Sequence, residues 1–271
     1  MPQTRLRLCR SLLFLPASNP RAIEKARELA ADMVILDLED AVKPEDKAAA
    51  REAAARAVET GFGGRVAAIR VNVATSPFYG DDIVAIRRGP ADFVIVPKVD
   101  DPRQLADAAR LTERPILAMI ETARGVLAAP AIAASCAGLI VGTNDLAADL
   151  ALPPSRGRAA LAHALQAVVL AARAAGVAVF DGVYNRLEDD AGLAEQCEEG
   201  RAFGFDGKSL IHPNQIEAAN RLFGPSDAEV EAARRLIATA TGGAERYEGE
   251  MIERMHVEQA RFVLARARQS S

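Results

Sequence analysis

Two carboxylates stand at the downstream ends of neighbouring apolar runs in this sequence. Glu121 directly follows the run that ends at Ile120, and Asp145 comes shortly after the run that ends at Val141. Because the carboxyl ends of parallel strands meet at one edge of a sheet, both side chains are expected at one site. Mg²⁺ prefers oxygen ligands and takes one or two protein carboxylates, with water and an anionic substrate completing its octahedron. We therefore predict a magnesium site at Glu121 and Asp145, although Asp145 alone is equally compatible with a helix N-cap.

A further group of charges ends the second and third apolar runs. Arg70 closes the third, and an arginine buried at that position needs an anionic partner. That partner is either a substrate carboxylate or one of the acids Asp37, Glu39 and Asp40. There are more acids here than one metal ion needs as ligands, so Glu39 and Asp40 are expected to orient other groups. Asp37 and Arg70 are candidate substrate contacts.

Lys98 and Asn144 complete the candidate substrate contacts. Lys98 would form a Schiff base in a metal-free aldolase, but this chemistry requires a lowered pKa. The neighbouring acids favour the protonated form instead, so the metal site is the preferred interpretation. The histidines do not have the spacing of a metal triad; they are His163, His212 and His256.

Composition limits the class of protein. The chain has 271 residues, half of them apolar, and a net charge of −4, without a basic cluster suited to nucleic acid or an anionic membrane. Its three cysteines lack the spacing of a disulfide framework or a zinc site, which favours a reducing cytoplasm. The N-terminal apolar run is too short for a signal peptide, and no run approaches the ~18 residues of a membrane span. We expect a cytoplasmic protein.

Eight short apolar runs alternate with segments of helical periodicity, as in a (β/α)8 TIM barrel of the α/β class. Most runs lack polar alternation, as strands buried on both faces should. An open doubly wound sheet is less favoured because it usually has fewer strands and a G-x-G-x-x-G turn. The predicted strands are Ser11–Leu15, Met33–Leu38, Val66–Val71, Phe93–Val96, Ile116–Ile120, Leu139–Val141, Val177–Phe180 and Phe205–Ile211, and helical segments include Pro20–Ala31, Pro44–Glu59, Pro102–Leu111, Arg158–Ala175 and Ala191–Phe203.

The pattern changes near the C-terminus. We predict a barrel domain over residues 1–224 and a helical extension over 225–271, with helices at Asp227–Ala240 and Glu253–Arg268 around a connector rich in glycine and charge. Such a connector allows the last helix to act as a lid on its own active site or on that of a neighbouring subunit. The alternative is a terminal helix that simply docks on its own barrel.

The motifs together resemble the citrate lyase beta-subunit-like proteins of the aldolase and citrate lyase superfamily, over nearly the whole chain. The motifs that carry the resemblance are Arg10–Pro16, Ile35–Val42, Arg70–Asn72, Val96–Val99, Ile120–Thr122, Gly142–Leu150 and Gly207–Ile216.

The resemblance implies a (β/α)8 barrel that binds magnesium through Glu121 and Asp145 and turns Arg70 toward the substrate. It also implies coenzyme A as part of the substrate, with Arg10, Lys208 and Pro213 toward the nucleotide, and a homo-oligomer, specifically a trimer. A terminal segment closes the site in this family, with an aspartate where this chain has Glu253. Glu253 is therefore a candidate catalytic base, displaced by one methylene, which puts the usual activity or substrate in question.

The activity implied by the resemblance is cleavage of a carbon–carbon bond in a short acidic 3-hydroxyacyl-CoA. Citramalyl-, malyl- and citryl-CoA are candidates, and the products are acetyl-CoA and an oxoacid. Three alternatives remain: the beta subunit of a citrate lyase complex that acts on a citryl-acyl-carrier protein, a coenzyme A-independent class II aldolase for hydroxy-oxo acids, and a non-catalytic acyl-CoA binder.

Overall fold

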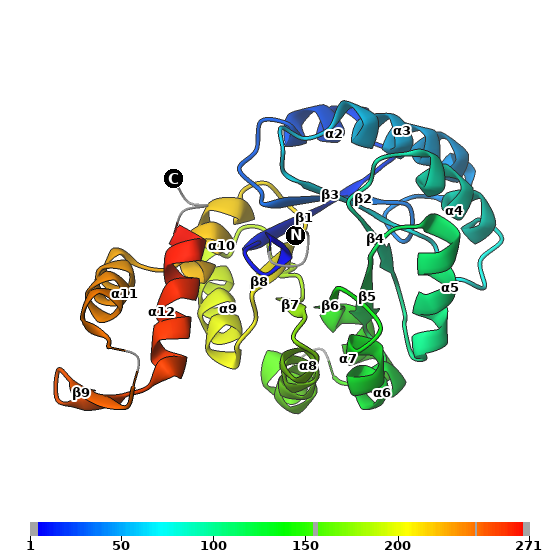
Figure 1. Ribbon diagram of the computed structural model, residues 1–271. Coiled ribbons are helices and arrows are strands. Elements are labelled where there is room, and N and C mark those ends of the chain that lie inside the picture. Colours follow the sequence, from blue (N-terminus) through cyan, green and yellow to red (C-terminus); the bar gives the residue numbers. More distant parts are fainter. Residues whose placement is uncertain (1–4, 154–156, 242, 268–271) are drawn as a thin grey trace.

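The computed structural model describes residues 5–153, 157–241 and 243–267. Eight parallel strands close into a barrel in chain order, β1 next to β8, with helices around the outside (Figure 1). This confirms the predicted TIM barrel. The strands are β1 (Ser11–Pro16), β2 (Met33–Asp37), β3 (Val66–Arg70), β4 (Phe93–Val96), β5 (Ile116–Ile120), β6 (Gly138–Val141), β7 (Ala178–Asp181) and β8 (Gly207–Leu210).

The connections after these strands contain the helices. Those of the barrel are α2 (Pro20–Ala26), α3 (Lys47–Thr60), α4 (Tyr79–Arg88), α5 (Pro102–Thr112), α6 (Ala123–Ala133), α7 (Thr143–Asp149), α8 (Ala162–Ala175), α9 (Asp190–Phe203) and α10 (Gln215–Phe223), with 3-10 turns η1 (Pro44–Asp46) and η3 (Arg158–Leu161) before α3 and α8.

Alternation along each strand divides the buried side chains into two layers. On β2, Met33 and Ile35 fill the barrel interior, whereas Val34 and Leu36 pack against the surrounding helices. Both layers are apolar, which explains why the strand sequences show continuous hydrophobic runs. The same parity decides which polar side chains at the strand ends reach the barrel mouth.

Helix α2 is shorter than predicted. It ends at Ala26 rather than Ala31. The Arg65 guanidinium, which comes from the loop before β3, donates to the carbonyl oxygens of Ala26, Arg27 and Leu29. Because a distant side chain satisfies these carbonyls, the chain can leave the helix before β2.

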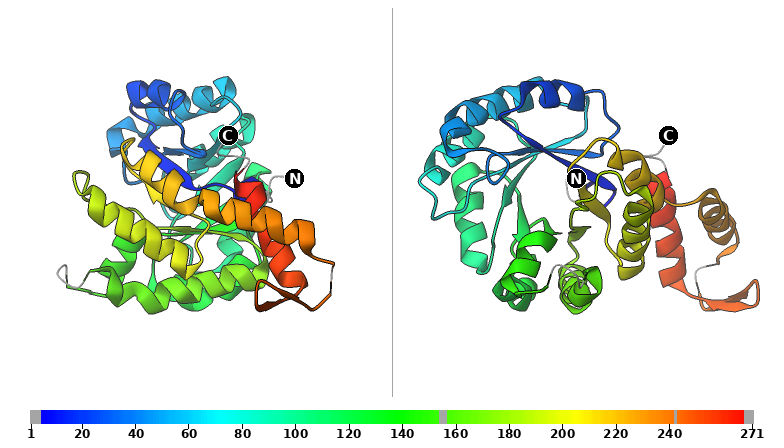
Figure 2. Two further views of the ribbon diagram at one scale, coloured as in Figure 1. Left: turned by 90° about the vertical axis from the view of Figure 1, so that its left-hand side faces the viewer. Right: turned by 180° about the vertical axis from the view of Figure 1, so that it is seen from behind.

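The C-terminal extension lies beside the barrel. It consists of α11 (Asp227–Thr239), a hairpin of β9 (Glu245–Tyr247) and β10 (Glu250–Ile252), and α12 (Arg254–Ala267). Helices α11 and α12 pack on each other, and the hairpin stands at the end of the extension that is remote from the barrel (Figures 1 and 2). Arg266 fixes the other end of α12 by donating to the carbonyl oxygens of Asp206 and Phe223, at 2.6 and 2.9 Å. The predicted end at Arg268 lies outside the described residues.

In the part of the chain that the structure describes, no helix is both long and apolar enough to cross a membrane.

Candidate active site

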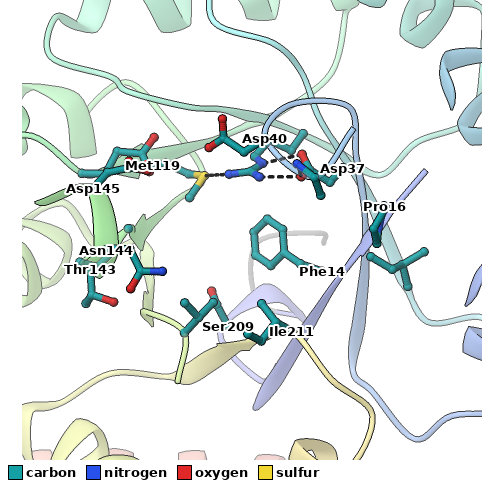
Figure 3. Close-up of a pocket in the computed structure, with 17 residues that line it drawn as sticks. Phe14, Pro16, Asp37, Asp40, Met119, Thr143, Asn144, Asp145, Ser209 and Ile211 are labelled. Atoms are coloured by element: carbon teal, nitrogen blue, oxygen red, sulfur yellow. Dashed lines mark hydrogen bonds and ion pairs between the residues drawn. The ribbon is translucent and has the colours of Figure 1, made fainter. Parts of the chain in front are cut away.

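A cavity of about 410 Å³ opens at the carboxyl ends of the strands (Figure 3). It brings together five of the residues predicted from the sequence: Asp37, Arg70, Glu121, Asn144 and Asp145. They come from β2, β3, the position directly after β5 and the start of α7. The mouth of the barrel therefore gathers these polar groups, as in other barrels of this type.

Glu121 is the buried member of the carboxylate pair. Its side chain follows β5, is only 1% exposed, and accepts a hydrogen bond from the backbone N–H of Lys98 at 2.7 Å. Burial raises the pKa of Glu121 to about 7, and the negative charge of Asp145 adds to this effect. Lys98 has φ 50°, a backbone conformation that non-glycine residues rarely adopt and that stores strain near functional sites.

The pair suits magnesium. Two adjacent carboxylates, one of them with its charge disfavoured by burial, gain from a divalent cation between them. Within the described ranges, no group of three or more His, Cys, Asp or Glu side chains is arranged to hold a metal ion. The donor set therefore fits a hard cation that completes its shell with water and substrate better than a closed zinc site.

Gly142 makes room for this carboxylate. A Cβ atom added there would lie 2.3 Å from Oε2 of Glu121 and 2.6 Å from its Cβ. The β6–α7 connection can pass directly over Glu121 only because residue 142 has no side chain.

We expect Gly142→Ala to displace Glu121 and to lower the affinity for magnesium by at least about tenfold, since a shift near 1 Å is costly at such sites. Titration calorimetry with MgCl₂ measures this. Gly80→Ala is the matched control, because a Cβ at residue 80 meets nothing within 4 Å. An unchanged affinity for magnesium in Gly142→Ala would show that Glu121 is not a ligand of the metal.

Arg70 is held from several sides. Its Nε and Nη2 donate to the two oxygens of Asp37, each at 2.6 Å, and its Nη1 lies 3.1 Å from Oε2 of Glu39. Nη1 also contacts Sδ of Met119 at 3.7 Å, and the guanidinium lies over the ring of Phe14 (Figure 3). Burial raises the pKa of Glu39 to about 8 despite the opposing effect of Arg70.

Asp37, which was predicted as a substrate contact, forms its hydrogen bonds within the protein. Besides the two bonds from Arg70, its oxygens accept the backbone N–H groups of Glu39 and Ala41 at 2.9 and 3.0 Å. The carboxylate is 1% exposed and its hydrogen-bonding capacity is taken up. Asp37 therefore positions Arg70, the orienting role that was expected of Glu39 and Asp40.

Lys47 is a functional neighbour that the sequence analysis missed. Its ammonium donates to the carbonyl oxygens of Leu38 and Glu39 and to Oδ1 of Asn72, all at 2.7 Å. Asn72 is held in turn by Asp82 at 2.7 Å. This network fixes the loop after β2. The sequence did contain a signal for this role: Lys47 stands on the alanine-rich face of α3, and a lysine buried on such a face needs hydrogen-bond acceptors.

Arg10 and Lys208 do not reach the cavity. Lys208 and Leu210 lie on the same face of β8, which points outward from the barrel. The ammonium of Lys208 is fully buried and donates to Asp181 and to the Gly182 carbonyl, at 2.8 and 2.7 Å. Arg10 lies before β1, at the opposite end of the barrel, where it pairs with Asp32 at 2.9 Å. Lys208 thus supports the barrel from within, whereas Arg10 lines, together with Pro213, a groove outside the cavity. The coenzyme A contacts of these residues stay predictions.

The remaining predicted residues lie around the rim. Lys98 is 40% exposed, with Nζ 3.9 Å from Glu39, and its nearby acids raise its pKa against the effect of partial burial. This favours the ammonium over a Schiff base, as predicted. Asn144 pairs with Asn185, whose amide donates to it at 2.7 Å. Pro213 lines a separate groove with α10. Glu253 is exposed between β10 and α12 and is not among the residues that line the cavity.

The chain is similar to known proteins over most of its length. The HpcH/HpaI aldolase/citrate lyase family model matches residues 10–213. A (3S)-malyl-CoA thioesterase of Cereibacter sphaeroides is 44% identical, with 95% of this chain and 94% of that protein covered. The citrate lyase subunit beta of Escherichia coli is 31% identical, with 98% and 96% covered.

A solved structure shares the whole architecture. The protein CitE from Mycobacterium tuberculosis, in complex with magnesium, acetoacetate and coenzyme A, superimposes with a TM-score of 0.81 at 33% identity, over 97% of this chain and 99% of that one. The matches extend over barrel and extension alike. The chain therefore belongs to the HpcH/HpaI aldolase/citrate lyase family.

Proposed function

We propose that this protein is a magnesium-dependent lyase that cleaves a short acidic 3-hydroxyacyl-CoA, of the malyl-, citramalyl- or citryl-CoA type, to acetyl-CoA and an oxoacid. The observation that carries the proposal is the cavity in which the Glu121 and Asp145 carboxylates face the same space as Arg70. In such a cavity a metal would bind a carboxylate and an adjacent hydroxyl of the substrate. The Arg70 guanidinium would then stabilise negative charge that develops on another part of the substrate.

Glu121 and Asp145 would hold the magnesium ion, which supplies Lewis-acid polarisation of the chelated oxygens when bound. Arg70 would stabilise negative charge on the substrate. Among the described residues, its Nη1 contacts the thioether of Met119 and one oxygen of Glu39, and a thioether is a weak acceptor that a ligand oxygen readily replaces. Its other nitrogens stay fixed on Asp37, so the guanidinium needs no reorganisation during the reaction.

Hydrolysis of the thioester is a second candidate reaction, favoured by the 44% identity to a malyl-CoA thioesterase. Glu121 and Asp145 would again hold the metal, and a water molecule would attack the thioester carbonyl while the carbon–carbon bond stays intact. The two reactions give different products: the lyase yields acetyl-CoA and an oxoacid, and the thioesterase yields the hydroxyacid and free coenzyme A.

Product analysis tests the proposal. Purified protein is incubated with magnesium and malyl-, citramalyl- or citryl-CoA, and products are separated by chromatography and mass spectrometry. The proposal predicts magnesium-dependent acetyl-CoA and oxoacid; free coenzyme A with the hydroxyacid would establish the thioesterase instead. Binding without turnover would favour a non-catalytic binder or a missing acyl-carrier protein and partner subunits, and turnover of free hydroxy-oxo acids would favour the class II aldolase.

The extension is proposed to complete the site of a neighbouring copy. Glu253 stands with exposed Met251 and Met255 at the end of the extension remote from its own barrel, which suits a contact between subunits of a homotrimer. There the Glu253 carboxylate would take the proton of the substrate hydroxyl.

We also propose a cytoplasmic location, in keeping with the free thiols of Cys9, Cys136 and Cys197.

Subunit mixing tests the role of Glu253. Glu253→Ala and Glu121→Gln subunits are each expected to be inactive alone. Mixed after mild dissociation, they are expected to recover activity, because some sites combine an intact Glu121 with an intact Glu253 from the neighbour. Full activity of Glu253→Ala alone would remove the residue from the mechanism, and inactive mixtures would place both residues in one subunit's site.

A further inference from the structure

Ser209 is a buried serine that lines the cavity but has no role in the sequence analysis or the proposed function. It lies on β8, opposite Leu12 of β1, and is 2% exposed. Because its neighbours Lys208 and Leu210 face the outer layer, alternation turns Ser209 into the barrel. Figure 3 shows its hydroxyl oxygen directed into the space bounded by Phe14, Asn144 and Ile211.

The hydroxyl of Ser209 lacks a hydrogen-bond partner among the described residues. A buried hydroxyl without a partner costs folding free energy, which an alanine of similar size would not. Ser11 on the neighbouring strand shows the usual arrangement, since its hydroxyl accepts the backbone N–H of Asp32 at 3.0 Å. A polar group that is left unsatisfied at the floor of a cavity is poised for a ligand or for a water that a ligand replaces.

The place of Ser209 in the cavity indicates which part of a ligand it meets. Asp145 and Asn144 stand on one side of the cavity, and Ser209 with Ile211 on another (Figure 3). Glu121 and Asp145 would hold the metal that takes the carboxylate and hydroxyl oxygens at one end of a malyl-type acyl group. The thioester carbonyl lies one methylene further along that group, and its oxygen is free for a donor on another side of the cavity.

We propose that Ser209 is a substrate-binding residue whose hydroxyl donates a hydrogen bond to the thioester carbonyl oxygen, alongside Arg70. The inference rests on the proposed function. This oxygen gains negative charge whether the carbon–carbon bond breaks to an enolate or water adds to the carbonyl. A neutral donor fixed in a cavity favours that charge without reorganising, so its hydrogen bond strengthens in the transition state.

Three variants test the inference: Ser209→Ala, Ser209→Thr, which retains a hydroxyl, and Ser11→Ala as the matched control. We expect Ser209→Ala to lower kcat roughly 100-fold, the usual scale for loss of one such donor. The melting temperature of the ligand-free protein should stay equal or rise, and magnesium-dependent binding of glyoxylate, which lacks the thioester, should be unchanged. Ser209→Thr should recover much of kcat. Ser11→Ala should instead lower the melting temperature and leave kcat nearly unchanged.

Unchanged kcat in Ser209→Ala would overturn the inference, as would a loss of kcat that follows a fall in melting temperature or is not recovered by Ser209→Thr. Failure of the proposed function is a separate result, seen as a wild-type protein that turns over no thioester. In that case the rise in melting temperature caused by acetyl-CoA is compared instead. A rise that is lost in Ser209→Ala supports the hydroxyl contact, and a rise that is equal in both proteins, or absent from the wild type, overturns it.

Discussion

Glu121→Gln is expected to abolish magnesium-dependent turnover, by at least about 1000-fold, while the protein remains folded. The amide keeps the size of the side chain but loses the negative charge that a magnesium ligand supplies. Because Glu121 is buried, the loss of its charge is not expected to destabilise the ligand-free protein. Steady-state assays with malyl-CoA and thermal melting measure both quantities, with the exposed Glu59→Gln as control.

The pH dependence of magnesium binding checks the same assignment. Burial raises the pKa of Glu121 to about 7, so protons compete with the metal for this carboxylate below that pH. By linkage, its contribution to the stability of the ligand-free protein is present at low pH and is lost as the pH rises toward 7. Wild-type affinity for magnesium should therefore fall between pH 8 and pH 6 in calorimetry.

A Glu121→Gln protein with wild-type turnover would refute the metal assignment.

Arg70→Met is expected to lower the free energy of unfolding by about 3–5 kcal/mol, the usual cost of removing one partner from a buried ion pair. The substitution leaves the Asp37 and Glu39 carboxylates, 1% and 5% exposed, without their cation. Turnover should be lost as well. Arg70→Lys should recover part of the stability but little activity, because an ammonium cannot reproduce the two parallel bonds to Asp37.

Urea denaturation measures this effect. Arg87→Met is the matched control: Arg87 forms an ion pair with Glu113 at 2.7 Å, but both side chains are more than half exposed, so its loss should cost about 1 kcal/mol or less. If Arg70→Met were as mild as this control, the buried network around Asp37 would not contribute to holding the site.

The sequence was sufficient to predict the barrel because strands buried on both faces give continuous apolar runs. The predicted strand at Phe93–Val96 has the observed bounds, and that at Met33–Leu38 differs by one residue. The sequence also placed Glu121 and Asp145 correctly at the mouth of the barrel, because residues that directly follow parallel strands lie together at that end.

The roles of individual polar residues were less predictable. Lys208 and Ser209 are adjacent, yet one faces outward and the other inward, and a strand with polar residues on both faces gives no signal that tells the two faces apart. The ion pair of Arg10 with Asp32 joins positions 22 residues apart in the sequence, and the end of α2 depends on Arg65 from beyond the next strand. Such partners are set by tertiary packing, which local pattern does not contain.

A crystal structure of the protein with magnesium and glyoxylate tests the central claim most directly. We expect one octahedral ion bound by a carboxylate oxygen of Glu121 and one of Asp145, with glyoxylate oxygens in the same shell and Arg70 still fixed on Asp37. An ion bound elsewhere, or glyoxylate in the cavity without contact to this carboxylate pair, would contradict the account.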